Sequence, residues 1–209
     1  MKKPVTFLLL CTFVLILFLN GCRSKSEKNG GIVQSDKSSA VHPSAEQGAS
    51  IHEAALNGDL DQVSLLLDKG CNVDTLDQDG RTALMYAAFN GHTAVINKLI
   101  LKSASVNIQD INGRTALMMA ASGPFPDAVK LLLENYADPN LTDKAEHFSA
   151  LMFAASEGQT EVVRTLMAHN ADPFMKDADG DDAITFAIRN NHKDAVVLLK
   201  SLMEMKKTK

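Results

Sequence analysis

Four aspartates near the end of the chain are the side chains best suited to holding a cation. Asp177, Asp179, Asp181 and Asp182 stand close together, and alternating carboxylates are the ligands of a helix-loop-helix calcium loop. Such a loop also needs glycine at its sixth position and an acid at its twelfth. Counted from Asp177, these positions hold Asp182 and Ile188. We therefore interpret the aspartates as a turn followed by a helix cap, and we expect no metal and no cofactor.

Histidines and cysteines are the next candidates for chemistry. His92 and His192 occupy the same place in a repeating pattern and lie several repeats apart, so at about 10 Å per packed helix layer they cannot share a metal ion. Cys71 stands where other copies of the pattern have alanine, which indicates packing. The sequence contains no G-x-S-x-G, no H-E-x-x-H and no phosphate-binding glycine loop. We interpret the histidines as structural and predict that the chain is not an enzyme.

Cys22 has the clearest chemistry. Lys2 and Lys3 precede an almost wholly apolar stretch over residues 5–19, which is typical of a secretion signal and is shorter than the about 20 residues of a membrane-spanning helix. The stretch runs into Leu-Asn-Gly-Cys, ending at Cys22, which resembles the lipobox of bacterial lipoproteins. The resemblance implies that residues 1–21 are a cleaved signal peptide and that the Cys22 sulfur is lipidated. Each buried acyl methylene contributes about 0.8 kcal/mol to such an anchor.

The residues after Cys22 bear on localisation. In lipoproteins an aspartate directly after the cysteine commonly signals retention in the inner membrane, and here the residue is Arg23. The resemblance therefore implies a cell-envelope protein, anchored in the outer membrane and facing the periplasm, with surface exposure as an open alternative. The segment 22–49 is rich in Ser, Lys, Gly, Gln and Glu and has no helical or strand period. Such a composition predicts a flexible tether.

From residue 50 onward the chain repeats itself. The stretch DQDGRTALMYAA that begins at Asp77 returns as DINGRTALMMAA at Asp110, and further copies follow at about the same interval of 33 residues. In most copies an aspartate opens a turn, a glycine gives it a permissive backbone, and Thr, Ser or Asp stands where a helix N-terminus needs a cap. Apolar residues at helical spacing, such as Val129, Leu132 and Leu133, predict a second helix.

This pattern resembles the ankyrin repeat, whose consensus runs D-x-x-G-x-T-P-L-H-x-A-A and ends in G-A-D-V-N. The resemblance implies an all-α fold, an ankyrin-repeat solenoid of about five helix-turn-helix repeats with short β-turn or hairpin tips. Met85, Met118 and Met152 replace the consensus histidine, which should change hydrogen bonding between repeats and leave the architecture intact. The repeat domain is expected over residues 50–203, before a basic tail at 204–209, with repeats of about 50–76, 77–109, 110–142, 143–176 and 177–203.

The second helices are predicted to end in left-handed caps of unequal quality. Gly70 and Asn170 suit a left-handed backbone. Ser103 and Tyr136 suit it less well, so we expect those two ends to be strained or closed differently. The last copy is more polar than the inner ones, as the exposed end of a solenoid has to be.

The charge of the repeat region restricts its partners. Residues 51–203 contain 21 acidic and 12 basic side chains, which leaves a net charge of −9. An acidic body repels phosphate backbones, so we expect no nucleic acid partner. A protein partner is expected, and the chain itself is predicted to be a monomer.

In ankyrin repeat proteins, partners usually contact the turn tips and the exposed side of the short helices. By position these residues are Gln78, Asp79, Arg81, Phe89, Asn90, Ile111, Asn112, Arg114, Lys144, Glu146, His147, Asp179, Asp181 and Arg189. The fourth turn has an extra residue and no glycine, so we predict that His147 and Phe148 form a distinct tip. One further position of the short helix, equivalent in four repeats, fits either the core or a partner contact. It is occupied by Tyr86, Met119, Phe153 and Phe186.

Two functions fit these observations. The first is an envelope-anchored scaffold or adaptor that binds a protein partner through the tips and short helices. The alternative is an immunity-type lipoprotein that inhibits a toxin or hydrolase acting in the envelope, an expectation by analogy with other proteins of this fold.

Overall fold

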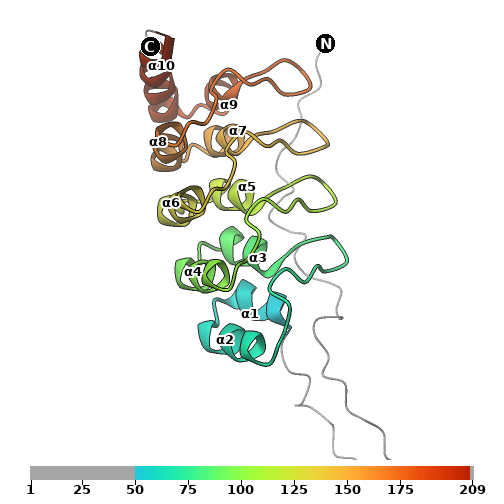
Figure 1. Cartoon of the computed structure of the whole chain (residues 1–209). Helices are drawn as coiled ribbons and strands as arrows, with labels where there is room; N and C mark the ends of the chain where they lie inside the picture. Colours follow the sequence, from blue (N-terminus) through green and yellow to red (C-terminus); the bar gives the residue numbers. More distant parts are fainter. Residues whose placement is uncertain (1–49, 208–209) are drawn as a thin grey trace, which may run out of the picture.

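The computed structural model describes residues 50–207, in which paired antiparallel helices stack into a solenoid (Figure 1). Each pair consists of a short inner helix and a longer outer one, and loops project to one side of the stack. Within these residues there is no strand, only an isolated bridge between Thr142 and Ser149. The expected all-α solenoid is confirmed. The helices are α1 (Ile51–Asn57), α2 (Leu60–Asp68), α3 (Ala83–Phe89), α4 (Thr93–Leu101), α5 (Ala116–Ala121), α6 (Pro126–Glu134), α7 (Ala150–Ser156), α8 (Thr160–Ala168), α9 (Ala183–Arg189) and α10 (Lys193–Lys207).

Every short helix starts at a side-chain cap. The hydroxyl or carboxylate of the residue before each helix accepts a hydrogen bond from a backbone N–H in the first turn, which satisfies a donor that the helix itself cannot. Four of the caps are hydroxyls and one is a carboxylate, so the capping chemistry is kept while the residue changes. The capping residues are Ser50, Thr82, Thr115, Ser149 and Asp182.

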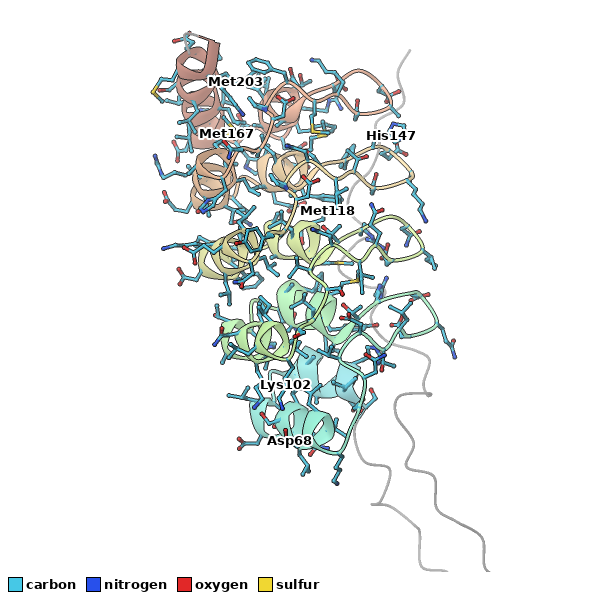
Figure 2. All side chains as sticks on the ribbon, in the orientation of Figure 1. Asp68, Lys102, Met118, His147, Met167 and Met203 are labelled. Atoms are coloured by element: carbon cyan, nitrogen blue, oxygen red, sulfur yellow. The ribbon has the colours of Figure 1, made fainter. Side chains whose placement is uncertain are left out.

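The core runs continuously through the stack because each short helix packs on the next. The alanine pairs of α1, α3, α5 and α7 are completely buried or nearly so, and their small side chains let neighbouring helices approach closely. Met85, Met118 and Met152 are buried between the layers, and Figure 2 shows Met118 inside the stack. An unbranched thioether adapts to irregular gaps, which explains how these methionines replace the consensus histidine without changing the fold.

Polar side chains join each repeat to the one before it. The side chains of Asn90 and His92 both reach the carbonyl oxygen of Leu56, at 2.7 and 2.9 Å. Because a carbonyl only accepts, His92 must donate from Nε2. Asn190 and His192 make the same two contacts to another carbonyl, that of Ser156. Both histidines therefore close the ends of short helices, as the structural interpretation expected.

A charged pair also crosses two outer helices. The Lys102 ammonium donates to Asp68 at 2.9 Å, and Figure 2 shows the two side chains together at the ends of α2 and α4. This hydrogen bond from Lys102 lowers the pKa of Asp68. The pair is exposed to solvent, so it contributes little to stability.

All four inter-repeat loops leave their outer helix through a left-handed residue. Ser103, Tyr136 and Asn170 each have φ of 67°, and Gly70 has φ of 87°. Of the two alternatives expected at Ser103 and Tyr136, the strained end is confirmed and the different closure is wrong, because the chain must turn in the same way in each repeat to bring the next helix into register. These two residues accept a strained backbone instead.

Tyr136→Gly should therefore stabilise the protein. The side chain is 89% exposed and is not needed for packing, while an L-residue in the left-handed region costs about 1–2 kcal/mol relative to glycine. Part of that gain is offset by the greater freedom of glycine in the unfolded chain, which leaves a net gain of about 1 kcal/mol. Urea unfolding followed by circular dichroism measures it. Gly70→Ala is the matched opposite change and should destabilise, and equal stability of Tyr136→Gly and wild type would contradict the argument.

The end of the solenoid differs from the inner repeats. Helix α10 continues to Lys207, so part of the predicted basic tail is helical, and Lys206 donates to the carbonyl of Ala171 at 2.7 Å. Ile188 takes the position of a buried alanine and is 58% exposed, so the last repeat is less polar than expected. No helix within residues 50–207 has the length and apolar character needed to cross a membrane.

Candidate protein-binding face

The loop tips are linked into a ladder by backbone hydrogen bonds. The N–H of Ile111 donates to Asp79 O at 3.0 Å, and the N–H of Lys144 donates to Asn112 O at 2.8 Å. The N–H of Ala178 donates to Glu146 O at 2.9 Å, which continues the series into the last repeat. The tips lie on one side of the stack in Figure 1. These bonds hold the exposed tip residues in fixed register.

Within each tip an aspartate closes the turn. One carboxylate oxygen accepts two backbone N–H groups from the residues that follow, an arrangement in which the side chain replaces a backbone partner. In the third repeat, for example, Asp110 Oδ1 accepts from Asn112 at 2.9 Å and from Arg114 at 2.8 Å. The turn-closing aspartates are Asp77, Asp110, Asp143 and Asp177.

The next tip packs directly on the turn glycine. A Cβ at Gly80 would lie 3.3 Å from the backbone nitrogen of Ile111, and a Cβ at Gly113 would lie 2.8 Å from that of Lys144. Both glycines also have positive φ. Glycine is therefore needed at these positions for close approach as well as for the left-handed backbone.

The fourth tip has the same left-handed turn position but no glycine in it. His147 adopts φ of 59° and takes the left-handed position of the turn, and Figure 2 shows it at the loop edge of the molecule. Phe148, predicted to share an exposed tip with it, is buried. Its ring packs edge-on against Phe153 and Phe186, with centroids 5.5 and 4.7 Å away. The extra residue lets the loop bulge while the phenylalanine turns into the interior.

Two arginines from neighbouring tips converge on one buried carboxylate. Asp110 Oδ2 lies 3.7 Å from Arg81 Nε and 3.5 Å from Arg114 Nε, and the Asp110 side chain has no exposed surface. Burial alone would lower the pKa of Arg81, but the neighbouring Tyr86 hydroxyl and the carboxylates of Asp79 and Asp110 raise it. The Arg81 guanidinium therefore stays charged.

Tyr86 connects this cluster to the first closing aspartate. Its hydroxyl donates to Asp77 Oδ2 at 2.6 Å, and the Arg81 guanidinium lies 6.0 Å from its ring centre. Burial, followed by the hydrogen bond to Asp77, raises the pKa of Tyr86. The phenol is thus a fixed donor that orients the second tip.

Exposed apolar residues occur at one of the tips and at the end of one short helix. Ile111 is 57% exposed at the third tip, and Phe89 is 39% exposed at the end of α3. The short-helix position that was expected to be either core or contact differs between repeats. Met119 and Phe186 are buried, and Tyr86 and Phe153 are half-buried. Ile111 and Phe89 are therefore the stronger apolar contact candidates.

Acidic residues of the fifth tip form hydrogen bonds and ion pairs within the protein. Asp177 closes the turn through Asp179 and Asp181 N–H groups, and Asp181 forms an ion pair with Arg189. Asp182 caps α9 and also accepts a hydrogen bond from Lys176 at 2.8 Å. In the part of the chain that the structure describes, no three His, Cys, Asp or Glu side chains are grouped to hold a metal ion.

Asp182 should make stability depend on pH in the acid range. Burial raises the pKa of this carboxyl, but the hydrogen bonds from Lys176 and Thr185 outweigh it and leave the pKa lowered. A lowered pKa in the folded state stabilises the protein above the unfolded value of about 3.9. That stabilisation is lost as pH falls through the folded pKa.

The expected result is that Asp182→Asn, which keeps a capping side chain, is less stable than wild type at pH 7 by about 1 kcal/mol or less. The difference should begin to shrink as pH falls through about 4, the unfolded pKa, and should disappear only once the folded carboxyl is protonated at lower pH. Thermal unfolding of both proteins from pH 3 to pH 7 measures it, and a constant difference across that range would contradict the assignment.

The predicted contact residues fall into two groups. The exposed ones are Gln78, Asp79, Phe89, Ile111, Asn112, Lys144, Glu146, His147, Asp179 and Arg189, and the half-buried ones are Arg81, Asn90, Arg114 and Asp181. Asn90 is used to close α1, and Asp181 and Arg189 are paired with each other. Sequence reasoning missed the burial of Asp110, for which the two arginines in register were the available signal. Cys22 lies outside the described residues.

The comparison with known families agrees with this architecture. A family model described as "Ankyrin repeats (3 copies)" matches the chain twice, over residues 51–143 and 126–208. No curated protein matches the chain. The two family matches together cover the whole stack of helical hairpins and most of the sequence. The chain therefore belongs to the ankyrin repeat family.

Proposed function

We propose that this chain is an envelope-anchored ankyrin repeat protein that binds a protein partner, as a scaffold or adaptor, through its turn tips and short inner helices. Ankyrin repeats generally mediate protein–protein interaction, typically without catalysis. The anchor in this proposal is a lipid on Cys22, and the expected location is the outer membrane on the periplasmic side. The anchor rests on the Leu-Asn-Gly-Cys motif after an apolar leader.

The observation that supports the binding face most strongly is exposed apolar surface on a fixed backbone. Ile111 is bonded through its N–H to the preceding tip, and its carbonyl accepts from Lys144 Nζ at 3.3 Å. A side chain held in this way loses little freedom on binding, so more of its burial contributes to affinity. Phe89 adds a large exposed ring at the end of the inner helix α3, and aromatic anchors in the centre of an interface dominate binding energies.

Affinity capture from envelope extract, followed by measurement of the affinity of the identified partner, tests this face. The triple variant Phe89→Ala/Ile111→Ala/Arg114→Ala should weaken partner binding by at least 100-fold, because anchor residues each contribute about 2 kcal/mol or more. The matched control removes similar groups from the outer helices: Leu65→Ala/Leu101→Ala/Lys130→Ala. The first two of these are exposed on α2 and α4. Equal binding by the tip variant and wild type would show that the partner uses another surface.

Metabolic labelling with a radioactive fatty acid tests the anchor. Label should appear on the wild-type chain and be absent from Cys22→Ala. An unlabelled wild type would remove the lipid part of the proposal and leave the binding face untouched.

The inhibitor alternative uses the same face but a different kind of partner. It requires that the captured partner be a toxin or hydrolase and that binding suppress its activity. Assay of the purified partner with and without this protein separates inhibition from scaffolding.

A further inference from the structure

The Arg81–Asp110–Arg114 cluster offers chemistry that a plain structural ion pair does not. Both Nε atoms lie within 4 Å of the same oxygen. However, within residues 50–207 neither Nε nor Asp110 Oδ2 makes a hydrogen bond, although all three atoms are buried. Buried polar groups are nearly always hydrogen-bonded, and those that are not commonly mark a functional position. The ion pairs with Asp110 hold the two guanidinium groups in place through Nε and do not engage their terminal amino groups.

The turn itself does not require these arginines. In the fourth and fifth repeats their position is taken by Phe148 and Asp181. Asp143 and Asp177 nevertheless close those turns through the same pair of backbone N–H groups. The arginines are therefore a feature of the second and third tips alone, added to a turn that folds without them.

Each arginine keeps some exposed surface at its tip. The Arg81 and Arg114 side chains are 26% and 21% exposed although their Nε atoms are buried, which leaves the terminal amino groups to reach solvent. Arg81 also lies 3.5 Å from the carboxylate of Asp79, itself 52% exposed. A surface pair of this kind contributes at most about 1 kcal/mol, so an incoming carboxylate can replace Asp79 at small cost.

We propose that Arg81 and Arg114 form a carboxylate-recognition pair within the partner-binding face, positioned by the buried carboxylate of Asp110, and that they take an aspartate or glutamate side chain of the partner. Planar guanidinium groups bind carboxylates through two parallel hydrogen bonds, which gives geometric selectivity as well as affinity. A side chain is specified, and not a chain end, because the ladder continues from the pair through the tips of the fourth and fifth repeats, so that an internal segment of the partner can lie across the pair. Ile111 stands beside the pair as an apolar contact. This inference rests on the proposed function.

Selection from a random-peptide library on the full-length chain in detergent tests it. The peptides are displayed through their C-termini, so that side chains supply the only carboxylates. The expected result is enrichment of Asp or Glu at one fixed position. The repeat domain is acidic overall, and general electrostatics would enrich Lys and Arg instead, so acidic peptides are a specific signature.

The affinity of a selected peptide then isolates the pair. Arg81→Gln/Arg114→Gln should weaken binding about 10- to 100-fold, the range for charge-assisted hydrogen bonds. Changing the acidic residue of the peptide to its amide should lower the affinity by the same factor. The arginine variant and the amide peptide together should lower the affinity no more than either change alone. The control Lys130→Gln/Arg164→Gln removes two positive charges from outer helices and should have little effect. If the glutamine variant does not fold, Arg81→Lys/Arg114→Lys replaces it, because this variant keeps both charges beside Asp110. It should lose the preference for the acidic peptide over its amide.

The possible failures are distinguishable. Selected peptides without an acidic preference, or a glutamine variant that binds as wild type does, would overturn the arginine pair. If those peptides still depend on Phe89 and Ile111, the proposed function stands. Peptides that bind independently of Phe89, Ile111 and both arginines would overturn the binding face and the pair together.

Discussion

Asp110→Ala is expected to destabilise the protein by about 3–5 kcal/mol, although Asp110 lies in a loop. The loss has two sources. Two backbone N–H groups, of Asn112 and Arg114, lose their acceptor. Two guanidinium groups lose Asp110, the one fully buried carboxylate within residues 50–207, and removing one partner of a buried ion pair typically costs about 3–5 kcal/mol because it leaves charge uncompensated.

Urea unfolding of the full chain, followed by circular dichroism, measures this effect against a matched control. Asp177→Ala removes the same type of acceptor from two backbone N–H groups in the last turn. It has no buried arginine beside it and is half-exposed, so its expected cost is about 1–2 kcal/mol. Asp110→Asn keeps an acceptor oxygen and should fall between them. Equal losses for Asp110→Ala and Asp177→Ala would show that the arginines contribute nothing to stability.

The features that could be predicted from the sequence are those that depend on residues within a single repeat. A cap followed by an apolar period defines a helix locally, so the caps at Thr82, Thr115 and Ser149 could be placed by residue type alone. The period between copies then defines the stack, because a helical hairpin of this size cannot bury its apolar face without a neighbour.

What the sequence did not reveal depends on contacts between copies. At Tyr136 the sequence left two alternatives, a strained end and a different closure, and the left-handed backbone is adopted because the next repeat must dock in register. Phe148 turns inward because Phe153 and Phe186 lie where its ring can pack. In both cases tertiary packing outweighs the local preference of the residue, and one copy considered alone contains no sign of it.

The binding face was predicted only from the place of each residue in the repeat. That place does not show which side chains form ion pairs or hydrogen bonds with each other. Asp181 and Arg189 were both expected to meet a partner, and they meet each other. Asn90 is used to close α1, the short helix of the preceding repeat. The residues that keep apolar or guanidinium surface for a partner are instead concentrated at the second and third tips, around Ile111.

Gly113→Ala should cost about 3–4 kcal/mol, whereas the same change at Gly180 should cost only about 1–2 kcal/mol. Both glycines have nearly the same positive φ, 80° and 83°, so alanine pays the same left-handed strain of about 1–2 kcal/mol at each. A Cβ at Gly113 would also lie 2.8 Å from the backbone nitrogen of Lys144, while at Gly180 nothing lies within 4 Å. Relieving that overlap requires a backbone shift, and overpacking of this kind typically costs 1–3 kcal/mol more.

The difference between the two variants therefore measures how strongly consecutive tips are coupled. Gly80→Ala provides the intermediate case, because its Cβ would lie 3.3 Å from the next backbone nitrogen, and its cost should fall between the other two. Hydrogen exchange at the amide of Lys144, which donates to Asn112 O, should accelerate in Gly113→Ala and stay unchanged in Gly180→Ala. If the three substitutions cost the same, the tips do not pack on one another tightly enough to act as one rigid surface, and a partner would meet independent loops.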